Sequence, residues 1–162
     1  MASVASDRRR SPMLVAVTVG TLLISLSGCS ASGALTPLQA RDSVEAAPGV
    51  KSATVTTGRV QETLGSTYYV DVRVDLEQGI DPMDLPHLVD YIAATGWATD
   101  IKHKPAQLQL NFGGAADFDM AKVLRAMNVE AIPGFDRSSA SVTAAHANKK
   151  WGQWPTRAPA WK

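Results

Sequence analysis

The chain has little cysteine and little histidine: its 162 residues include one cysteine and three histidines. One cysteine cannot form an internal disulfide, so the folded part must be stabilised by its hydrophobic core. The histidines, His87, His103 and His146, form no i, i+4 pair and have no second cysteine to join them, so none of the known zinc spacings is present. We therefore expect neither a metal ion nor a cofactor.

Motifs that carry catalysis are also lacking. The sequence has no Gly-x-Ser-x-Gly and no His-Glu-x-x-His, and Gly113-Gly114 lacks the following lysine and hydroxyl residue of a phosphate loop. Asp117 and Asp119 could ligate a divalent cation, but such a pair also suits the start of a helix, with Asp117 as the N-cap. These absences favour a non-catalytic protein. The alternative is an enzyme, such as a hydrolase, with a site that these motifs do not describe.

No apolar run in the sequence is long enough for a stable membrane span. The longest, Met13–Leu26, has fourteen residues. As a helix it would rise about 21 Å, which is short of the roughly 30 Å hydrocarbon core of a bilayer. It follows Arg8-Arg9-Arg10 and leads into small residues, which is the order of an export signal. The arginines also suit twin-arginine export, but Ser11-Pro12 lacks the aromatic residue and leucine of such signals, so the general secretion route is favoured.

The one cysteine ends this region, in Leu26-Ser27-Gly28-Cys29. These four residues resemble the lipobox of bacterial lipoprotein precursors: a branched apolar residue, a small residue, Gly or Ala, and then cysteine. The resemblance implies that a signal peptide, residues 1–28, is cleaved before Cys29, and that the Cys29 thiol carries a diacylglyceryl group. The alternative is an ordinary secretory signal followed by a buried structural cysteine.

Lipidation would decide where the mature chain resides. A thiolate is the nucleophile that a thioether bond needs near neutral pH. In lipoproteins the new amino group is often acylated as well, and two acyl chains hold a protein durably on a bilayer. We expect the protein on the outer face of the bacterial cell membrane, bound to membrane lipid through Cys29. Residues 29–34 form a short tether of mostly small residues, so the folded domain should lie close to the bilayer.

Residues 35–132 have the hydrophobic patterns of a folded domain. Apolar and polar residues alternate in Tyr68–Glu77 and Gln107–Phe112, which predicts strands with one buried face. Thr36-Pro37 is typical of a helix N-cap followed by the first helical position. The other expected elements are a helix ending at Pro48-Gly49, a strand from Val50 to Thr57, a turn over residues 58–66, a helix from Asp81-Pro82 to Gly96, a strand from Trp97 to Lys102, a helix after Asp117 and a short strand from Val129 to Ile132.

This order, αββαββα, predicts an α+β fold. One-sided strands favour a two-layer sandwich with a mainly antiparallel sheet and the helices on one face. The segments "AAPGVKSATV", "YYVDVRVDL" and "LVDYIAATGWATDI" resemble heavy-metal-associated domains, and their αββαβ order is similar to that of BON domains; the resemblance covers roughly residues 38–103. The Cys-x-x-Cys of the metal-binding family is absent, so no metal chemistry is implied. The BON resemblance implies a module that binds lipid or a partner.

Residues 133–162 form a basic tail rich in tryptophan, and no acidic residue follows Asp136. Tryptophan together with cations suits a membrane interface or an anionic cell-wall polymer. The alternatives are a tail that wraps back over the sheet or helices, and a disordered tail. The overall net charge of +1 does not favour nucleic acid as a partner. The candidate residues for envelope contact are Lys149, Lys150, Trp151, Trp154, Arg157 and Trp161.

Taken together, these patterns predict a membrane-anchored lipoprotein. We expect it to be a non-catalytic module that binds or organises a component of the cell envelope, with an envelope hydrolase as the alternative.

Overall fold

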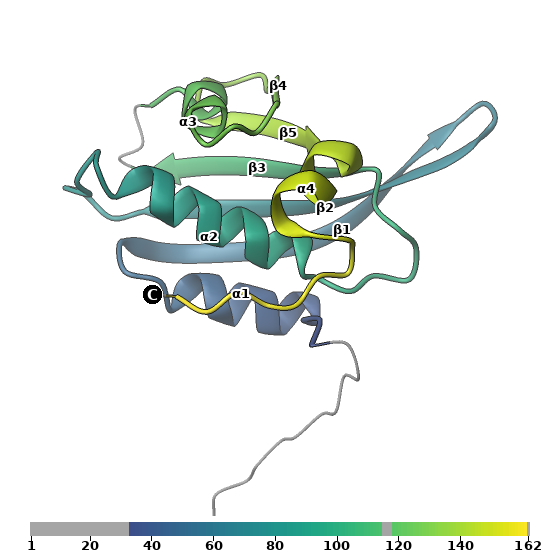
Figure 1. Cartoon of the computed structure of the whole chain (residues 1–162), viewed down its shortest axis with the longest axis horizontal. Coiled ribbons are helices and arrows are strands. Elements are labelled where there is room, and N and C mark those ends of the chain that lie inside the picture. The colour runs from purple at the N-terminus through teal and green to yellow at the C-terminus, as the bar shows by residue number, and fades with distance from the viewer. Residues whose placement is uncertain (1–32, 115–117, 162) are drawn as a thin grey trace, which may run out of the picture.

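The computed structural model describes residues 33–114 and 118–161. The lipobox, with Cys29, and Asp117 lie outside the described residues. Within them the chain forms four helices and five strands (Figure 1). The elements are α1 (Pro37–Glu45), β1 (Val50–Glu62), β2 (Gly65–Leu76), α2 (Leu85–Trp97), β3 (Gln107–Gly114), α3 (Met120–Ala126), β4 (Ile132–Pro133), β5 (Ser139–Thr143) and α4 (Ala144–Trp151).

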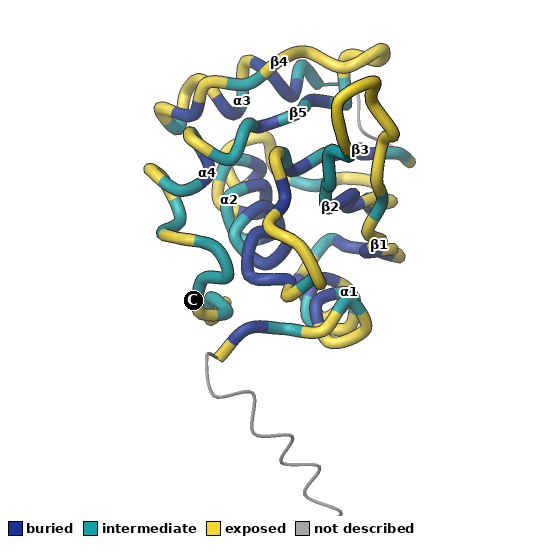
Figure 2. Tube along the Cα trace, turned by 90° about the vertical axis from the view of Figure 1, so that its right-hand side faces the viewer, coloured by how far each residue is buried: buried dark blue, intermediate teal, exposed yellow. Residues whose placement is uncertain are grey.

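The five strands form one mixed sheet in the order β1-β2-β3-β5-β4. The pairs β1–β2, β3–β5 and β4–β5 are antiparallel, whereas β2 and β3 are parallel and are joined by the crossover helix α2, as parallel neighbours require. The helices form a layer on one face, and buried residues gather between the two layers (Figure 2). The α+β class is confirmed, with α3, β4, β5 and α4 following β3.

The alternation in two of the expected strands is confirmed. In β2 the residues Val70, Val72 and Val74 are buried under the helices, and in β3 so are Leu108 and Leu110. The residues between them face the other side of the sheet, as period two dictates. The core therefore lies between this face of the sheet and the helix layer.

The expected cap of the first helix is confirmed, and that of the third is corrected. The Thr36 hydroxyl accepts from the Gln39 backbone N–H (3.2 Å), and the Gln39 side chain accepts from the Thr36 backbone N–H (2.9 Å), which completes a capping box. At α3 the N-cap is Asp119, whose carboxylate accepts from the Lys122 backbone N–H (3.0 Å). Capping therefore accounts for the Asp119 carboxylate without a metal ion.

The expected strand from Trp97 to Lys102 is wrong, because α2 does not end at Gly96. The helix continues to Trp97, and in the following segment only Thr99 forms a bridge, to Leu35. Gly96 is buried inside the helix, and a Cβ there would lie 2.7 Å from Val72 and 2.9 Å from Leu108. This glycine lets the helix approach the sheet closely, although its position in the sequence is also typical of a helix stop.

Replacing Gly96 by alanine should lower the free energy of unfolding by about 1–2 kcal/mol, measured by urea denaturation. Overpacking against Val72 and Leu108 costs about 1–3 kcal/mol, and the better helix propensity of alanine recovers up to about 1 kcal/mol. The control is Ala94→Gly, at a half-buried position of the same helix. It makes the reverse exchange of alanine and glycine away from Val72 and Leu108, and so measures the difference in helix propensity. A stabilising Gly96→Ala would contradict the close helix–sheet contact.

The first hairpin is longer than expected, so the expected end of its first strand at Gly58 is wrong. Pairing continues from Gly58 opposite Tyr69 to Glu62 opposite Gly65, and the hairpin extends beyond the helix layer (Figure 1). Gly58 fits within the strand because the Tyr69 ring occupies the space that a side chain at Gly58 would fill. The turn is confined to the residues between the two strands.

The expected domain boundary at residue 132 falls inside the sheet. Strand β5 pairs with β3, and β4 pairs with β5, so the segment assigned to the tail supplies two strands and helix α4. Ala140 and Val142 of β5 are buried in the same core as the other strands. Among the described residues of this segment, only the loop of residues 134–138 and the chain after Trp151 lie outside helices and strands.

Candidate functional site

The chain after α4 lies against the C-terminal end of α2, and two indole groups secure it. The buried Trp97 donates from Nε1 to the Gly152 carbonyl oxygen (3.0 Å), and Trp154 donates from Nε1 to the Thr99 carbonyl oxygen (3.0 Å). We call residues 152–161 the docked tail. Of the three alternatives for this region, the structure has the tail wrapped back over the helices.

Docking leaves few of the predicted envelope-contact groups available. The indole N–H of Trp151 is bound to Asp90 (2.9 Å), and Lys150 donates to the Met127 carbonyl oxygen (3.2 Å) and lies 3.7 Å from the Asp90 carboxylate. Trp161 lies edge-on against Tyr91, with 37% of its surface exposed. In the described part of the chain, no hydrogen bond or ion pair holds the exposed side chains of Lys149 and Arg157. Envelope contact through the tail stays a prediction, now carried mainly by these two cations.

The helix-free face of the sheet is polar and internally paired. At its centre Asp71, only 5% exposed, accepts hydrogen bonds from Asn111 Nδ2 (2.6 Å) and Arg73 Nε (2.9 Å). Thr56 and Gln109 are its cross-strand neighbours. Because buried polar atoms need partners, this network explains how a carboxylate can lie nearly covered in the sheet. It is a satisfied polar surface without an unpaired carboxylate at its centre.

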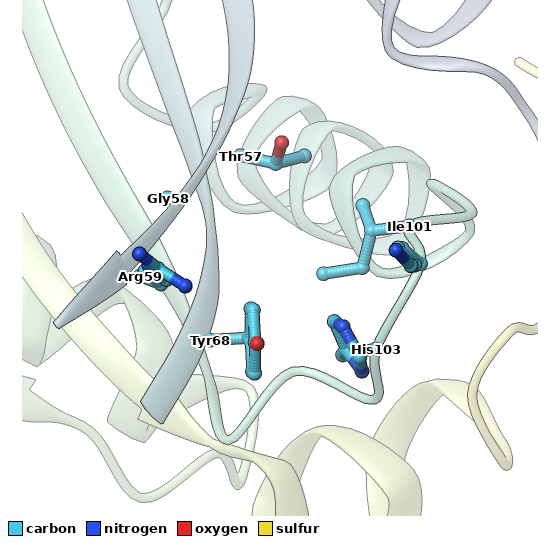
Figure 3. A pocket seen from close by; sticks show the side chains of 7 residues that line it. Thr57, Gly58, Arg59, Tyr68, Ile101 and His103 are labelled. Carbon is cyan, nitrogen blue, oxygen red and sulfur yellow. The ribbon is translucent and has the colours of Figure 1, made fainter. Parts of the chain in front are cut away.

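A pocket of about 370 Å³ opens beyond the C-terminal end of α2 (Figure 3). The Tyr68 and His103 rings, both in its lining, stack against each other with centroids 4.3 Å apart. Arg59 and Lys102 add two cations, and no acidic residue is among the described residues that line it. We call this the basic pocket; its lining residues are Thr57, Gly58, Arg59, Tyr68, Ile101, Lys102 and His103.

Three backbone hydrogen bonds hold the wall that carries Lys102 and His103. The Asp100 N–H donates to the Leu35 carbonyl oxygen (2.7 Å), and the Leu35 N–H donates to the Ala98 carbonyl oxygen (2.9 Å). On the far side of the wall, the Ala106 N–H donates to the Tyr68 carbonyl oxygen (2.8 Å). The segment between α2 and β3 is therefore fixed at both ends against β2 and the start of the described chain.

A second pocket, of about 520 Å³, is acidic. Glu77, Asp81 and Asp84 line it together with His87 and Trp161. Within residues 33–114 and 118–161, however, no three histidine, cysteine or acidic side chains lie close enough together to hold a metal ion. The His87 ring instead packs on Trp161, with centroids 4.8 Å apart.

None of these surfaces has the arrangement of a nucleophilic enzyme. In the described parts of the chain, no serine or threonine hydroxyl is hydrogen-bonded to a histidine. The pKa of Arg41 is raised because its guanidinium donates hydrogen bonds to the Asp42 carboxylate (2.6 and 3.0 Å). This pair lies on α1, with side chains 42% and 57% exposed, and lines neither of the two pockets described above.

The fold and its surfaces define a small α+β module with a polar sheet face, a basic pocket and a docked tail. Comparison of the chain with protein-family models, with curated proteins and with solved structures found no match. None of the helices in residues 33–114 and 118–161 has the length and apolar character needed to traverse a membrane.

The sequence placed the candidate contacts in the tail and missed the basic pocket. Arg59, Tyr68 and Lys102 come from three separate segments, which only the long hairpin and the fixed wall bring together. The one available signal was the charge pattern Lys102-His103-Lys104 with a single acidic neighbour, Asp100, just before it.

Proposed function

We propose that the protein is a lipoprotein held at the outer face of a bacterial cell membrane through Cys29, and that it binds or organises an envelope component without catalysis. The observation that carries this proposal is the order of the N-terminal features: Arg8-Arg9-Arg10, then Met13–Leu26, then Leu26-Ser27-Gly28-Cys29. Each part has the size and chemistry that export, cleavage and thioether formation need.

The place where the folded body begins supports the anchor. The docked tail binds the chain at Gly33, where the carbonyl oxygen accepts a hydrogen bond from the Ala158 N–H (3.2 Å). Three residues lie between Cys29 and Gly33, so the four steps along the chain reach at most about 14 Å. A body attached so closely would be kept at the membrane surface, where a binding module can meet lipid or wall components.

The non-catalytic part of the proposal has its own support. The carboxylate at the centre of the sheet face, Asp71, already accepts hydrogen bonds from Arg73 and Asn111. These bonds favour a structural role for Asp71 over a catalytic one. The basic pocket, by contrast, presents cations without partners, which suits the binding of an anion.

Replacing Cys29 by serine tests the anchor directly. We expect the unaltered chain, produced in a bacterium fed a labelled fatty acid, to take up the label and to lose residues 1–28. Cys29→Ser should take up no label and keep the signal peptide, because a hydroxyl does not replace the thiolate. The matched control is Ser30→Ala, at the residue that follows Cys29, which should be labelled normally. Label on Cys29→Ser, or an unlabelled original chain, would refute the proposal.

A further inference from the structure

We propose that the basic pocket binds the phosphate group of an anionic phospholipid headgroup in the bilayer that holds the anchor. This inference rests on the proposed function, because it needs the folded body to be held at the membrane surface. In this site Arg59 and Lys102 would bind the phosphate oxygens, and Tyr68 and Thr57 would be further hydrogen-bond donors.

The two cations of the pocket, Arg59 and Lys102, have no partner among the described residues, unlike the paired cations Lys122 and Arg73. Lys122 lies 3.9 Å from Asp119, and Arg73 donates to Asp71. Arg59 and Lys102, in contrast, make no hydrogen bond or ion pair with any described residue. Glu62 and Asp100, the acidic residues nearest in the sequence to Arg59 and Lys102, are not among the residues that line the pocket. The pocket therefore concentrates uncompensated positive charge in a concave site.

The uncharged groups in the pocket suit the same ligand. The hydroxyl groups of Thr57 and Tyr68 have no hydrogen-bond partner among the described residues, so both are available as donors to phosphate oxygens. A guanidinium such as that of Arg59 pairs with phosphate in a bidentate manner, and a lysine adds a point charge. Ile101 supplies an apolar wall, and Figure 3 shows it beside His103 on the segment that faces the hairpin.

The position of the pocket favours a lipid as the source of the phosphate. The tether enters the body at Gly33, and Leu35 is paired with Ala98 and Asp100 immediately before the pocket wall begins at Ile101. In Figure 1 the described chain starts at the end of the sheet from which the hairpin extends. A body tethered within about 14 Å of the bilayer at this end would present its basic pocket to the headgroups.

The test uses the full mature protein, purified from membranes with its lipid and kept in maltoside micelles, which contain no phosphate. Phosphatidylglycerol, phosphatidylcholine and inorganic phosphate are titrated in separately, and amide chemical shifts are followed by NMR. We expect phosphatidylglycerol to shift the amides of Gly58, Lys102 and His103 saturably, at lower concentration than phosphatidylcholine, and inorganic phosphate to compete for the same site.

Charge-removing variants complete the test. Arg59→Gln and Lys102→Gln should each weaken binding of phosphatidylglycerol about fivefold, the effect of one cation near an anionic surface. Arg125→Gln and Lys51→Gln, which alter exposed side chains outside the pocket, should leave it unchanged. Unchanged shifts elsewhere in the spectrum verify that each variant is folded.

Three outcomes would overturn the inference. Absence of shifts at the pocket would exclude the site. Equal responses to both lipids would exclude a preference for the anionic headgroup, and shifts with inorganic phosphate but with neither lipid would show a free-anion site only. None of these outcomes bears on the anchor, because fatty-acid labelling at Cys29 does not depend on Arg59 or Lys102. Conversely, an unlipidated chain that still prefers phosphatidylglycerol would refute the anchor alone.

Discussion

Replacing Trp97 by alanine should lower the free energy of unfolding by about 3–5 kcal/mol, the cost of emptying a fully buried aromatic site. The Trp97 side chain has no exposed surface and lies in the core that joins α2 to the sheet. The free energy of unfolding of a small domain is only about 5–15 kcal/mol in total. This one substitution should therefore remove a large part of the stability of the domain. Urea denaturation followed by circular dichroism measures it.

A second substitution separates packing from hydrogen bonding at the same site. Trp97→Phe keeps most of the ring volume but removes the donor to the Gly152 carbonyl oxygen, and it should cost about 1–3 kcal/mol. Trp161→Ala, at a partly exposed ring near the chain end, is the matched control and should cost much less. A loss below 1 kcal/mol for Trp97→Ala would contradict the buried position of Trp97.

Deleting residues 152–162 should lower the free energy of unfolding by about 3 kcal/mol or more. The deletion removes the packing of Trp154 against the core, its hydrogen bond to Thr99 and the acceptor for Trp97. Hydrogen exchange of the Thr99 amide should become faster, because the segment that covers it is gone. Lys149→Gln, on the exposed side of α4, is the control and should change stability by less than about 0.5 kcal/mol.

An unchanged free energy of unfolding after this deletion would show that the tail does not dock. That result would support the prediction of a free tail in contact with the envelope. The docked geometry also affects how envelope contact is tested. Because the deletion would disturb the core, envelope contact is better tested with Lys149→Gln and Arg157→Gln. These variants remove charge without removing a described hydrogen bond or ion pair, and their binding to anionic vesicles is compared with that of the unaltered chain.

The predictable parts of the fold were those with a local cause. Alternation in β2 and β3 follows from one buried face, and the cap at Thr36 needs only Gln39, three residues away. The end of α2 was mispredicted because Gly96 is explained by a distant contact with Val72 and Leu108. A helix-breaking residue placed for close packing cannot be distinguished from a stop signal by its neighbours in the sequence.

The start of the tail is placed too early by the sequence for a related reason. Strand β5 is only five residues long, and its buried side consists of Ala140 and Val142, too weak a pattern to be recognised alone. Tryptophans near cations suit a membrane interface, but an indole also packs in a core and donates to a backbone carbonyl, as Trp154 does to Thr99. The choice between these roles depends on the carbonyl groups left exposed at the end of α2, which a sequence does not display.

Mass spectrometry of the N-terminal peptide of the protein recovered from its native membrane tests the proposed anchor most directly. We predict a chain that begins at Cys29 and carries the mass of a diacylglyceryl group on its sulfur. A chain that retains residues 1–28 and has an unmodified thiol at Cys29 would contradict the anchor, and with it the proposed site of action.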